Sequence, residues 1–486
     1  MKKIFLSLAV ISSLSVNAFS DEISELREAI KLLTEKVNSL EKKQSQAPTT
    51  QSDVKVLTDK VNKLEKKQKR TQKTLAKVKA HDAYDNVKFG IDLRSSVDRL
   101  DYKNNDTGEK ASNHSLLTSR LYLTMKSSPT KDLIFNGKLA VYSIWGSELY
   151  VTDAPLKEWS ASSKPSDTVL RVKEAYFVYS SALGEQPISF SIGRRPSTNG
   201  FLSNYRENEE NPGSPLAHIT NMEVDAMMTK FNWDRFLEGA YSKFVFGRAH
   251  SGEMENVYGT GSSYGYSTPY AYTEGDDDPV DFAMVLGDAY NNGQHQLMYE
   301  WAHIFNTKGH NIADNTNAKA AGVADLYALS YKMEGVGNEI SDFLDDTILF
   351  ASIAGTTYNA DSGYTLLGSE DGGSETGYSY WLGAVFPDMF TEDGKIGLEF
   401  NHGSQYWTPM TWAEDTASGS KISVRGDAYE AYWNFNLFGV KYLPSQIRYT
   451  YVQHDYTPNI NCAGWIASEK ADITSQDVRV SVSYRY

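Results

Sequence analysis

The carboxy-terminal segment from Ser475 to Tyr486 constrains the fold more than any other stretch of the sequence. Its residues alternate between apolar and polar side chains, which is the two-residue period of a β-strand with one apolar face. Such a strand needs a neighbour along each edge, because unpaired N–H and C=O groups are costly in an apolar environment. The apolar positions are Val478, Val480, Val482, Tyr484 and Tyr486, and the polar ones are Asp477, Arg479, Ser481, Ser483 and Arg485.

The amino-terminal residues 1–20 have the pattern of a secretory signal peptide. Lys2 and Lys3 precede an apolar stretch from Ile4 to Val16, and small residues before Asp21 suit cleavage there. Beyond this leader no apolar run is long enough for a membrane helix, and the mean hydropathy is −0.47. A transmembrane barrel is compatible with this polarity, because only alternate strand residues face lipid.

From residue 86 onward, clusters of Gly, Asn, Asp, Ser and Pro divide the sequence into short alternating segments. Long and short connections alternate between them, which is typical of a bacterial outer-membrane barrel with long outer loops and short periplasmic turns. We predict an all-β transmembrane antiparallel barrel of about sixteen strands, with a range of about 14 to 18, preceded by an α-helical coiled-coil segment. The predicted strands cover residues 87–100, 116–126, 131–143, 169–180, 187–194, 225–233, 236–246, 281–287, 294–303, 325–333, 346–356, 378–386, 395–403, 427–435, 446–454 and 475–486.

Because the predicted number of strands is even, the first strand begins and the last strand ends on the same side of the barrel, the side with the short turns. The last strand is therefore predicted to run antiparallel to Lys88 through Leu93 and to close the wall. Together with the leader, the terminal pattern resembles the closing strand of an outer-membrane barrel. In that reading Tyr484 and Tyr486 belong to the signal for the barrel-assembly machinery, and the outward apolar residues contact outer-membrane lipids.

Residues 21–80 carry two heptad-like runs, which predict a periplasmic coiled coil. The segments 31–44 and 55–68 are copies, identical at 11 of 14 positions, and Pro48 between them is expected to interrupt the helix. The predicted seam residues are Ile23, Leu26, Ile30, Leu33, Val37, Leu40, Val54, Leu57, Val61, Leu64, Leu75 and Val78.

Two arrangements of this coil remain open, a parallel bundle between subunits and a hairpin within one chain. We favour a homo-oligomer, and a trimer among the possible oligomers. The lysine excess between Lys55 and Lys79 is compatible with contact to anionic peptidoglycan, although a solvated charged face explains it as well.

The charge is distributed unevenly along the chain. Residues 1–80 contain 17 Lys and Arg against 9 Asp and Glu, whereas the remaining residues contain 31 against 53, a net charge of −22. A barrel lined by those carboxylates would prefer cations weakly.

The long connection 195–224 is the best candidate for a pore constriction. In diffusion porins one long loop folds into the lumen, where opposed charges set an ion preference. The alternative is an external loop with incidental charges. The candidate constriction residues are Arg194, Arg195, Arg206, Glu207, Glu209 and Glu210.

No motif with catalytic specificity is present. The sequence lacks a Gly-rich phosphate loop at a strand-to-helix junction, an HExxH pair and a GxSxG elbow. We therefore predict no enzymatic activity, no cofactor, no metal site and no nucleic-acid partner. Cys462 is the single cysteine, so an intrachain disulfide is impossible.

Three blocks of the sequence resemble a family of outer-membrane proteins of unknown function from Campylobacterota. The blocks are LEKKQKRTQKTLAKVKAHDAYDNVKF (64–89), LRVKEAYFVY (170–179) and SIGRRPSTNGFLSNYRENEENPGSPLAHITNMEVDA (191–226). The resemblance implies an outer-membrane location and a barrel but no substrate. The layout is also similar to sugar- and phosphate-type porins that carry an amino-terminal periplasmic coil.

The predicted organisation is a signal peptide (1–20), a periplasmic coiled coil (21–80) and an outer-membrane barrel (86–486). The predicted function is a porin-like channel for passive diffusion of small hydrophilic solutes or ions across the outer membrane of a Gram-negative cell. The alternative is a structural protein with a sealed lumen that braces the envelope through its coil.

Overall fold

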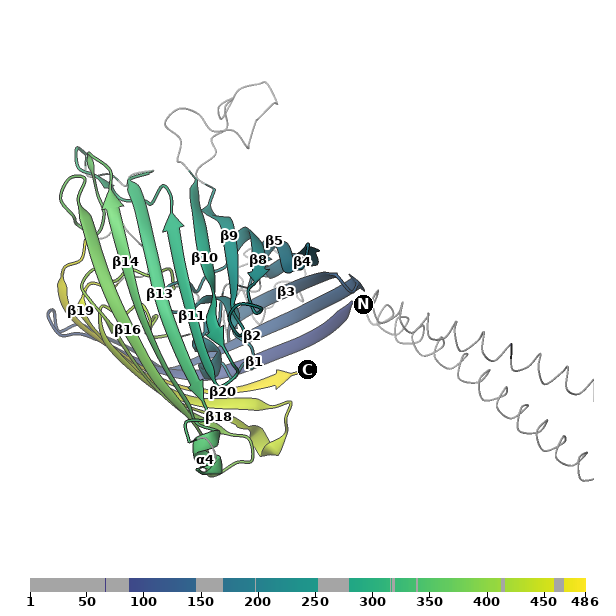
Figure 1. The fold of residues 1–486 in the computed structure, drawn as a ribbon. Helices are drawn as coiled ribbons and strands as arrows, with labels where there is room; N and C mark the ends of the chain where they lie inside the picture. Colours follow the sequence, from purple (N-terminus) through teal and green to yellow (C-terminus); the bar gives the residue numbers. More distant parts are fainter. Residues whose placement is uncertain are drawn as a thin grey trace, which may run out of the picture. The chain divides into compact units, whose positions relative to one another are not determined.

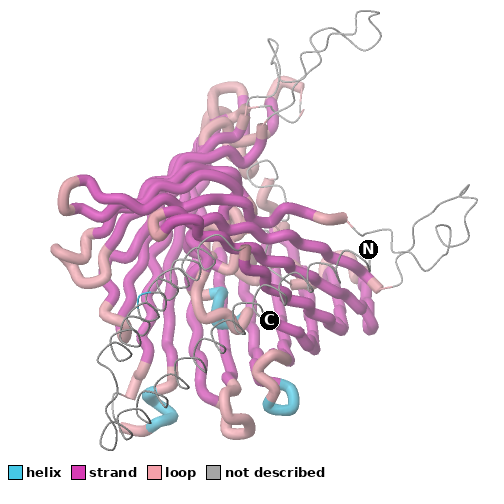
Figure 2. Tube along the Cα trace, turned by 90° about the vertical axis from the view of Figure 1, so that its right-hand side faces the viewer, coloured by secondary structure: helices cyan, strands magenta, loops and turns pink. Residues whose placement is uncertain are grey.

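The computed structural model describes residues 66, 87–145, 169–196, 198–251, 279–314, 316, 320–337, 340–411, 416–458 and 467–486. The predicted signal peptide and coiled-coil seam lie outside these residues. Residues 87–486 form one unit, a closed antiparallel barrel of sixteen strands (Figures 1 and 2). The prediction of an antiparallel barrel with sixteen strands is confirmed. No helix among the described residues is long and apolar enough to span a bilayer.

All sixteen predicted strands are present, with boundaries that differ by up to six residues, the largest difference being at the start of β2. The wall contains β1 (Lys88–Asn104), β2 (Lys110–Thr130), β3 (Leu133–Ile144), β4 (Arg171–Leu183), β5 (Gln186–Arg195), β8 (Val224–Asn232), β9 (Tyr241–His250), β10 (Val280–Asn291), β11 (His295–Ile304), β13 (Gly322–Glu334), β14 (Ile348–Ala360), β16 (Ser374–Pro387), β17 (Lys395–Gly403), β18 (Gly426–Asn436), β19 (Pro444–Tyr456) and β20 (Lys470–Arg485).

Short elements occupy some of the connections. They are β6 (Gly200–Phe201), α3 (Ser203–Arg206), β7 (Gly213–Leu216), β12 (His310–Asn311), α4 (Asp342–Asp345), β15 (Tyr364–Thr365) and the 3-10 turn η1 (Leu437–Gly439).

Most of the longer connections lie at one end of the barrel, as predicted; the exceptions are 105–109, which is short, and 335–347, which is as long as 361–373. One end of the barrel carries residues 105–109, 145–170, 196–223, 251–279, 305–321, 361–373, 404–425 and 457–469, and the other carries 131–132, 184–185, 233–240, 292–294, 335–347, 388–394 and 437–443. The prediction for the first connection was wrong. Residues 101–115 were predicted as a long loop, but β1 and β2 continue as a paired hairpin, and only residues 105–109 connect them.

The barrel closes between β1 and β20, as predicted, but the predicted register is wrong: of the stretch from Lys88 to Leu93, only Asp92 and Leu93 belong to the paired residues, with Ile91 bonded at their end. Asp92 lies opposite Arg485, and the antiparallel register continues to Asn104 opposite Ile473. The backbones of Ile91 and Tyr486 exchange two hydrogen bonds of 2.8 Å. The terminal aromatic residue therefore seals the short-turn end of the seam.

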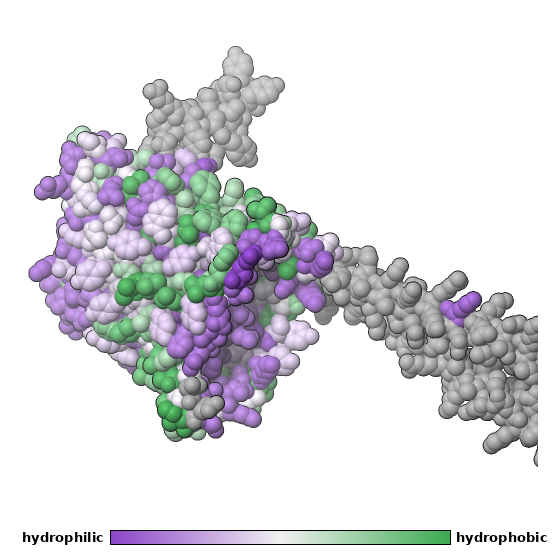
Figure 3. Space-filling model, in the orientation of Figure 1, coloured by the Kyte–Doolittle hydropathy of each residue, from purple (hydrophilic) through white to green (hydrophobic). Residues whose placement is uncertain are grey.

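Alternate residues face opposite sides of this wall. On β20, Val478, Val480, Val482 and Tyr484 are exposed on the outside, whereas Asp477, Arg479, Ser481 and Ser483 are buried on the inside. Figure 3 shows hydrophobic patches on the outer face of the barrel. The polar face of the terminal segment thus lines the lumen.

The interior of the barrel is packed unevenly. Residues 198–221, which we call the inner segment, lie inside the barrel and pack against β10, β11, β13, β14 and β16. Leu202, Leu216 and Ile219 of this segment are fully buried beside the inward side chains of wall strands. The wall from β20 through β1 to β5 instead carries charged inward residues, such as Arg120, Lys173 and Arg479.

Candidate solute passage

Hydrogen bonds to the wall hold the inner segment inside the barrel. Glu300 of β11 accepts a hydrogen bond from the Leu216 backbone N–H (2.5 Å) and one from the Thr220 hydroxyl (2.9 Å). His218 lies between the hydroxyls of Ser352 (2.7 Å) and Ser379 (2.9 Å), and burial lowers its pKa to about 3. His218 is therefore neutral at physiological pH. Its two hydrogen bonds hold the inner segment against the wall without placing a positive charge in the interior.

Two glycines allow the inner segment to fold back on itself. A Cβ on Gly200 would lie 2.0 Å from the Pro215 carbonyl oxygen, and a Cβ on Gly213 would lie 2.3 Å from the Thr198 carbonyl oxygen. Any larger residue would push these backbones apart. The close approach explains why this loop is compact enough to fit within the lumen.

A buried charge network ties α3 and the 404–425 connection to the wall. The Lys421 ammonium lies 2.5 Å from both Glu399 Oε2 and Glu430 Oε1. Arg206 pairs with Glu207 at 2.9 Å and lies 3.9 Å from Glu430. Every one of these side chains is nearly or fully buried, so the network neutralises charges that water does not solvate.

A polar cavity of about 540 Å³ opens beside β2, β3 and β4 on the long-loop side of the lumen. Arg120, Arg171 and Lys173 line it, and Lys173 forms an ion pair with Glu223. The Arg120 guanidinium lies 4.3 Å from the centre of the Tyr122 ring. Tyr142 also lines the cavity and is 41% exposed, so water reaches this part of the barrel interior.

A narrower polar cavity of about 30 Å³ lies towards the short-turn side. Its charged lining consists of Arg94, Arg120, Glu207 and Arg485, with Ser481 and Ser483 of β20 beside them. The side chain of Arg94 lies 3.8 Å from Glu207, and Asp92 lies 3.5 Å from Arg120 and 3.3 Å from Arg485. Arg120 lines both cavities, so its side chain borders the larger cavity on one side and the smaller one on the other.

The six residues predicted for the constriction occupy different places. Glu207 lines the narrow cavity. Arg194 lies at the edge of the larger cavity, where it pairs with Asp225 at 2.8 Å on the outward side of the wall. Of the six candidate side chains, these two line the described cavities.

The other four candidates line neither of the two polar cavities. Arg195 is buried on the inward face of β5 against the Tyr176 ring, at 4.7 Å. Arg206 is buried in the charge network, and Glu209 accepts a hydrogen bond from Asn199 at 3.1 Å within the inner segment, where burial raises the pKa of Glu209. Glu210 is exposed and lines neither cavity.

The candidates chosen from the sequence did not include the basic residues of the wall that line the cavities. Arg94 and Arg485 both occupy polar positions of alternating strands, so the inward direction of their side chains follows from the strand period. The alternation does not show which wall strands remain uncovered on their inner side, because that depends on where the inner segment packs. Within the described ranges, no group of three His, Cys, Asp or Glu side chains is placed to hold a metal ion.

Several solved barrels are similar to this chain in fold. A high-pH structure of Pseudomonas putida OprB is 11% identical, with a TM-score of 0.45, and the match covers 82% of this chain and 94% of that one. An anion-selective porin from Comamonas acidovorans is 13% identical, with a TM-score of 0.45 and coverage of 82% and 99%. The outer membrane channel DcaP of Acinetobacter baumannii is 14% identical, with a TM-score of 0.42 and coverage of 83% and 98%.

Comparison with curated proteins finds no match. A family model does match, over residues 110–483, which include most of the barrel wall from β2 to β20. The chain therefore belongs to the family described as "Protein of unknown function (DUF3373)".

Proposed function

We propose that this protein is an outer-membrane channel through which small hydrophilic solutes diffuse passively. The observation that carries the proposal is the pair of polar cavities that both border Arg120, one towards each end of the barrel. A sealed structural barrel has no need of two water-accessible cavities in line along one wall. The passage we propose runs along β20, β1, β2, β3 and β4, beside the inner segment.

The outer face of the wall supports placement in a membrane. Large apolar side chains are exposed at outward positions all round the barrel, including Leu93, Ile192, Tyr327, Leu382 and Val480. A barrel in water would leave this surface unfavourably hydrated, whereas lipid covers it.

A row of charged residues borders the apolar outer surface near the long-loop end of the barrel. Asp225 lies opposite both Arg194 and Arg248 on neighbouring strands, and Arg248 lies opposite Asp281. The outward pairs Arg194–Asp225 and Arg248–Asp281 are 2.8 and 2.7 Å apart. Alternating charges at the long-loop ends of β5, β8, β9 and β10 suit the polar headgroup region.

The charges along the proposed passage favour anions. Among the described residues that line the two cavities, the cations on the inner side of the wall are Arg94, Arg120, Arg171, Lys173 and Arg485, and the acids are Glu207 and Glu223. Asp92, which pairs with Arg120 and Arg485, reduces the excess but does not remove it. The weak cation preference expected from the net charge of −22 is therefore not what the lining supports, because only charges near the passage act on a permeating ion.

Reversal-potential measurements in planar bilayers with unequal KCl concentrations test this proposal. We expect channels whose reversal potential corresponds to preferred passage of chloride. Changing Arg120 to Glu alters the charge beside both cavities by two units, so the preference should shift severalfold towards potassium. The matched control, Arg235→Glu, changes an exposed residue in the 233–240 turn and should leave the preference unchanged.

One observation favours the alternative of a structural protein with a sealed lumen. The inner segment and the 404–425 connection fill the half of the interior that faces β10 to β18. Purified protein that produces no conductance at any voltage would support that alternative and overturn the channel.

The remaining parts of the proposal concern processing and assembly. We propose that residues 1–20 are removed, that residues 21–80 form a coiled coil in the periplasm, and that the bacterium belongs to the Campylobacterota. We further propose a homotrimer in contact with outer-membrane lipids, inserted by the barrel-assembly machinery, with the lysine-rich part of the coil near peptidoglycan. Both chain ends of the barrel lie at its short-turn end, which is compatible with this orientation.

A further inference from the structure

The larger polar cavity contains one basic side chain that the rest of the wall does not neutralise. Arg171, the first residue of β4, lines this cavity and is exposed. Among the described residues, its guanidinium has neither an acidic partner nor a hydrogen bond. Lys173 differs, because it forms an ion pair with Glu223, the only carboxylate among the described lining residues. The charge of Arg171 is therefore available to a negatively charged ligand.

A small residue leaves space beside this arginine. Ala140 of β3 lies opposite Tyr122 on β2 and opposite Arg171 on β4. Cross-strand partners share one face of a sheet, so these three side chains project to the inner face of the wall. The larger side chains of Tyr122 and Arg171 thus flank a gap whose floor is a single methyl group.

An aromatic ring borders the same gap. Tyr142 follows Ala140 by two residues on the inner face of β3, lines the cavity and is 41% exposed. Its ring meets that of Tyr122 edge to face, with the centroids 6.0 Å apart. Arg120 lies over the Tyr122 ring, whereas no described cation lies over the ring of Tyr142. Aromatic rings pack favourably against one another, so Tyr142 offers a surface for a flat ligand ring.

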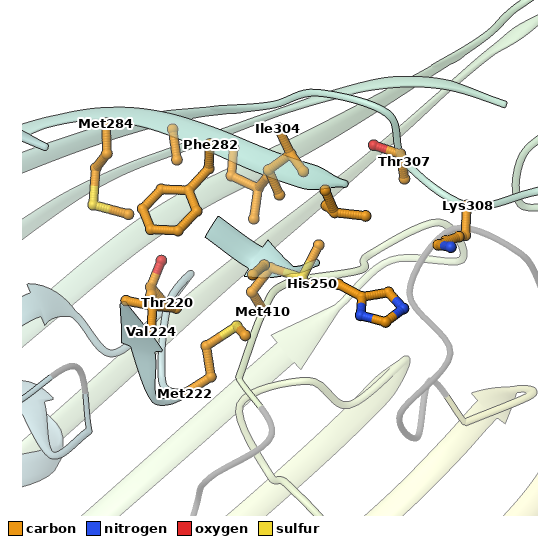
Figure 4. A pocket seen from close by; sticks show the side chains of 14 residues that line it. Thr220, Met222, Val224, His250, Phe282, Met284, Ile304, Thr307, Lys308 and Met410 are labelled. Carbon is orange, nitrogen blue, oxygen red and sulfur yellow. The ribbon is translucent and has the colours of Figure 1, made fainter. Parts of the chain in front are cut away.

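The size and composition of the cavity favour an organic anion. Its volume of about 540 Å³ falls within the range of small-molecule sites. An inorganic anion would contact Arg171 but leave Tyr142 uncovered, and a neutral sugar would find no unpaired carboxylate to accept its hydroxyl protons. The apolar cavity that Met284 and Phe282 line (Figure 4) has no described lining residue in common with this one.

We propose that the larger polar cavity binds small aromatic carboxylates. The two carboxylate oxygens accept hydrogen bonds from Arg171, whose planar guanidinium matches their geometry. The ring of the ligand lies over Ala140 and against Tyr142, and Thr198 and Asn199 of the inner segment complete the lining. That such a ligand is also a transported solute rests on the proposed channel function, because the cavity belongs to the proposed passage.

Three probes separate the contributions of charge and ring. Benzoate has both, benzamide is its uncharged counterpart of the same shape, and acetate has the charge without the ring. Each is titrated by calorimetry into the full chain in lipid nanodiscs, and the heat from empty nanodiscs is subtracted. We expect saturable binding of about one benzoate per chain, with benzamide and acetate binding about tenfold more weakly or less.

Variants of the cavity assign the binding to this site. Arg171→Gln should weaken benzoate about tenfold or more and leave benzamide unchanged. Its control, Arg99→Gln, removes an exposed arginine that lines neither polar cavity and should change neither probe. Tyr142→Ala should weaken both ring-bearing probes severalfold, whereas Tyr378→Ala removes an exposed tyrosine from the outer face of β16 and should weaken neither.

A further variant keeps the test decisive if removal of Tyr142 prevents folding. Ala140→Phe fills the gap from its floor and should weaken benzoate and benzamide alike. Far-UV circular dichroism and the heat-modifiable mobility of the barrel confirm that each variant has folded.

The proposed site is overturned if no saturable benzoate binding is found above the nanodisc background, or if folded Arg171→Gln binds benzoate like the wild type. Benzamide or acetate that binds as tightly as benzoate would overturn the assignment of an aromatic carboxylate. Bilayer conductance tests the channel separately. Conductance without benzoate binding would overturn the site and leave the channel, whereas benzoate binding without conductance would overturn the channel and leave the site.

Discussion

Replacing Lys421 by methionine is expected to lower the free energy of unfolding by about 3–5 kcal/mol. Lys421 lies 2.5 Å from Glu399 and 2.5 Å from Glu430, and all three side chains are almost completely buried. Without the ammonium group, two carboxylates face each other in the interior with less positive charge to neutralise them. Urea unfolding of the folded barrel in lipid vesicles, monitored by tryptophan fluorescence, measures the loss.

Two further variants make this result specific. Lys441→Met removes an exposed lysine from the 437–443 turn and should change stability by less than about 0.5 kcal/mol. Adding Glu399→Gln to Lys421→Met removes one of the carboxylates and should recover part of the loss. Equal stability of the Lys421 and Lys441 variants would show that the network contributes nothing to holding the 404–425 connection inside the barrel.

Replacing residues 198–221 with a short Gly-Ser linker is expected to raise single-channel conductance about threefold or more. The inner segment occupies the lumen beside the proposed passage, and Asn199 and Asn208 at its surface line the two polar cavities. The same change uncovers apolar wall residues such as Leu326 and Phe350, so the variant should also be less stable. Conductance is therefore compared between folded, membrane-inserted barrels only.

The control for this deletion places the same linker in the 361–373 connection. That connection is at the same end of the barrel, but it lines neither polar cavity. Its replacement should leave the conductance unchanged. If removal of the inner segment has no larger effect than this control, the passage does not run beside the segment.

The barrel itself could be predicted because its two strongest signals are local. The two-residue period identifies each strand, and the turn residues divide one strand from the next, as Gly184 does with its φ of 63° in the tight turn between β4 and β5. Alternation of long and short connections then gives an even number of strands. The register of the closing pair was less predictable, because it depends on the tilt of the whole wall.

The site was less predictable because it depends on contacts between residues far apart in the sequence. Charge within the 195–224 connection suggested a constriction, but Arg206 is buried and Glu209 bonds to Asn199 within the inner segment, whereas the wall residues Arg94 and Arg120 line the smaller cavity. One signal for the inward packing was present: in β10, Phe282 to Leu286 are apolar without interruption, as expected when both faces of a strand are covered. The segment that covers the inner face cannot be identified from that run.

Chemical modification of a single cysteine at position 485 tests the central claim most directly. In a Cys462→Ser background, Arg485→Cys places a thiol at the narrow cavity, and Ser330→Cys places one on β13 in the packed half of the lumen, where Ser330 is fully buried. Bilayer conductance is recorded before and after addition of a positively charged methanethiosulfonate reagent. The account predicts that the reagent reduces the conductance of the Arg485→Cys channel by more than about half and leaves the Ser330→Cys channel unchanged. A block of the Ser330→Cys channel without a block of the Arg485→Cys channel would place the passage in the other half of the barrel and contradict the account.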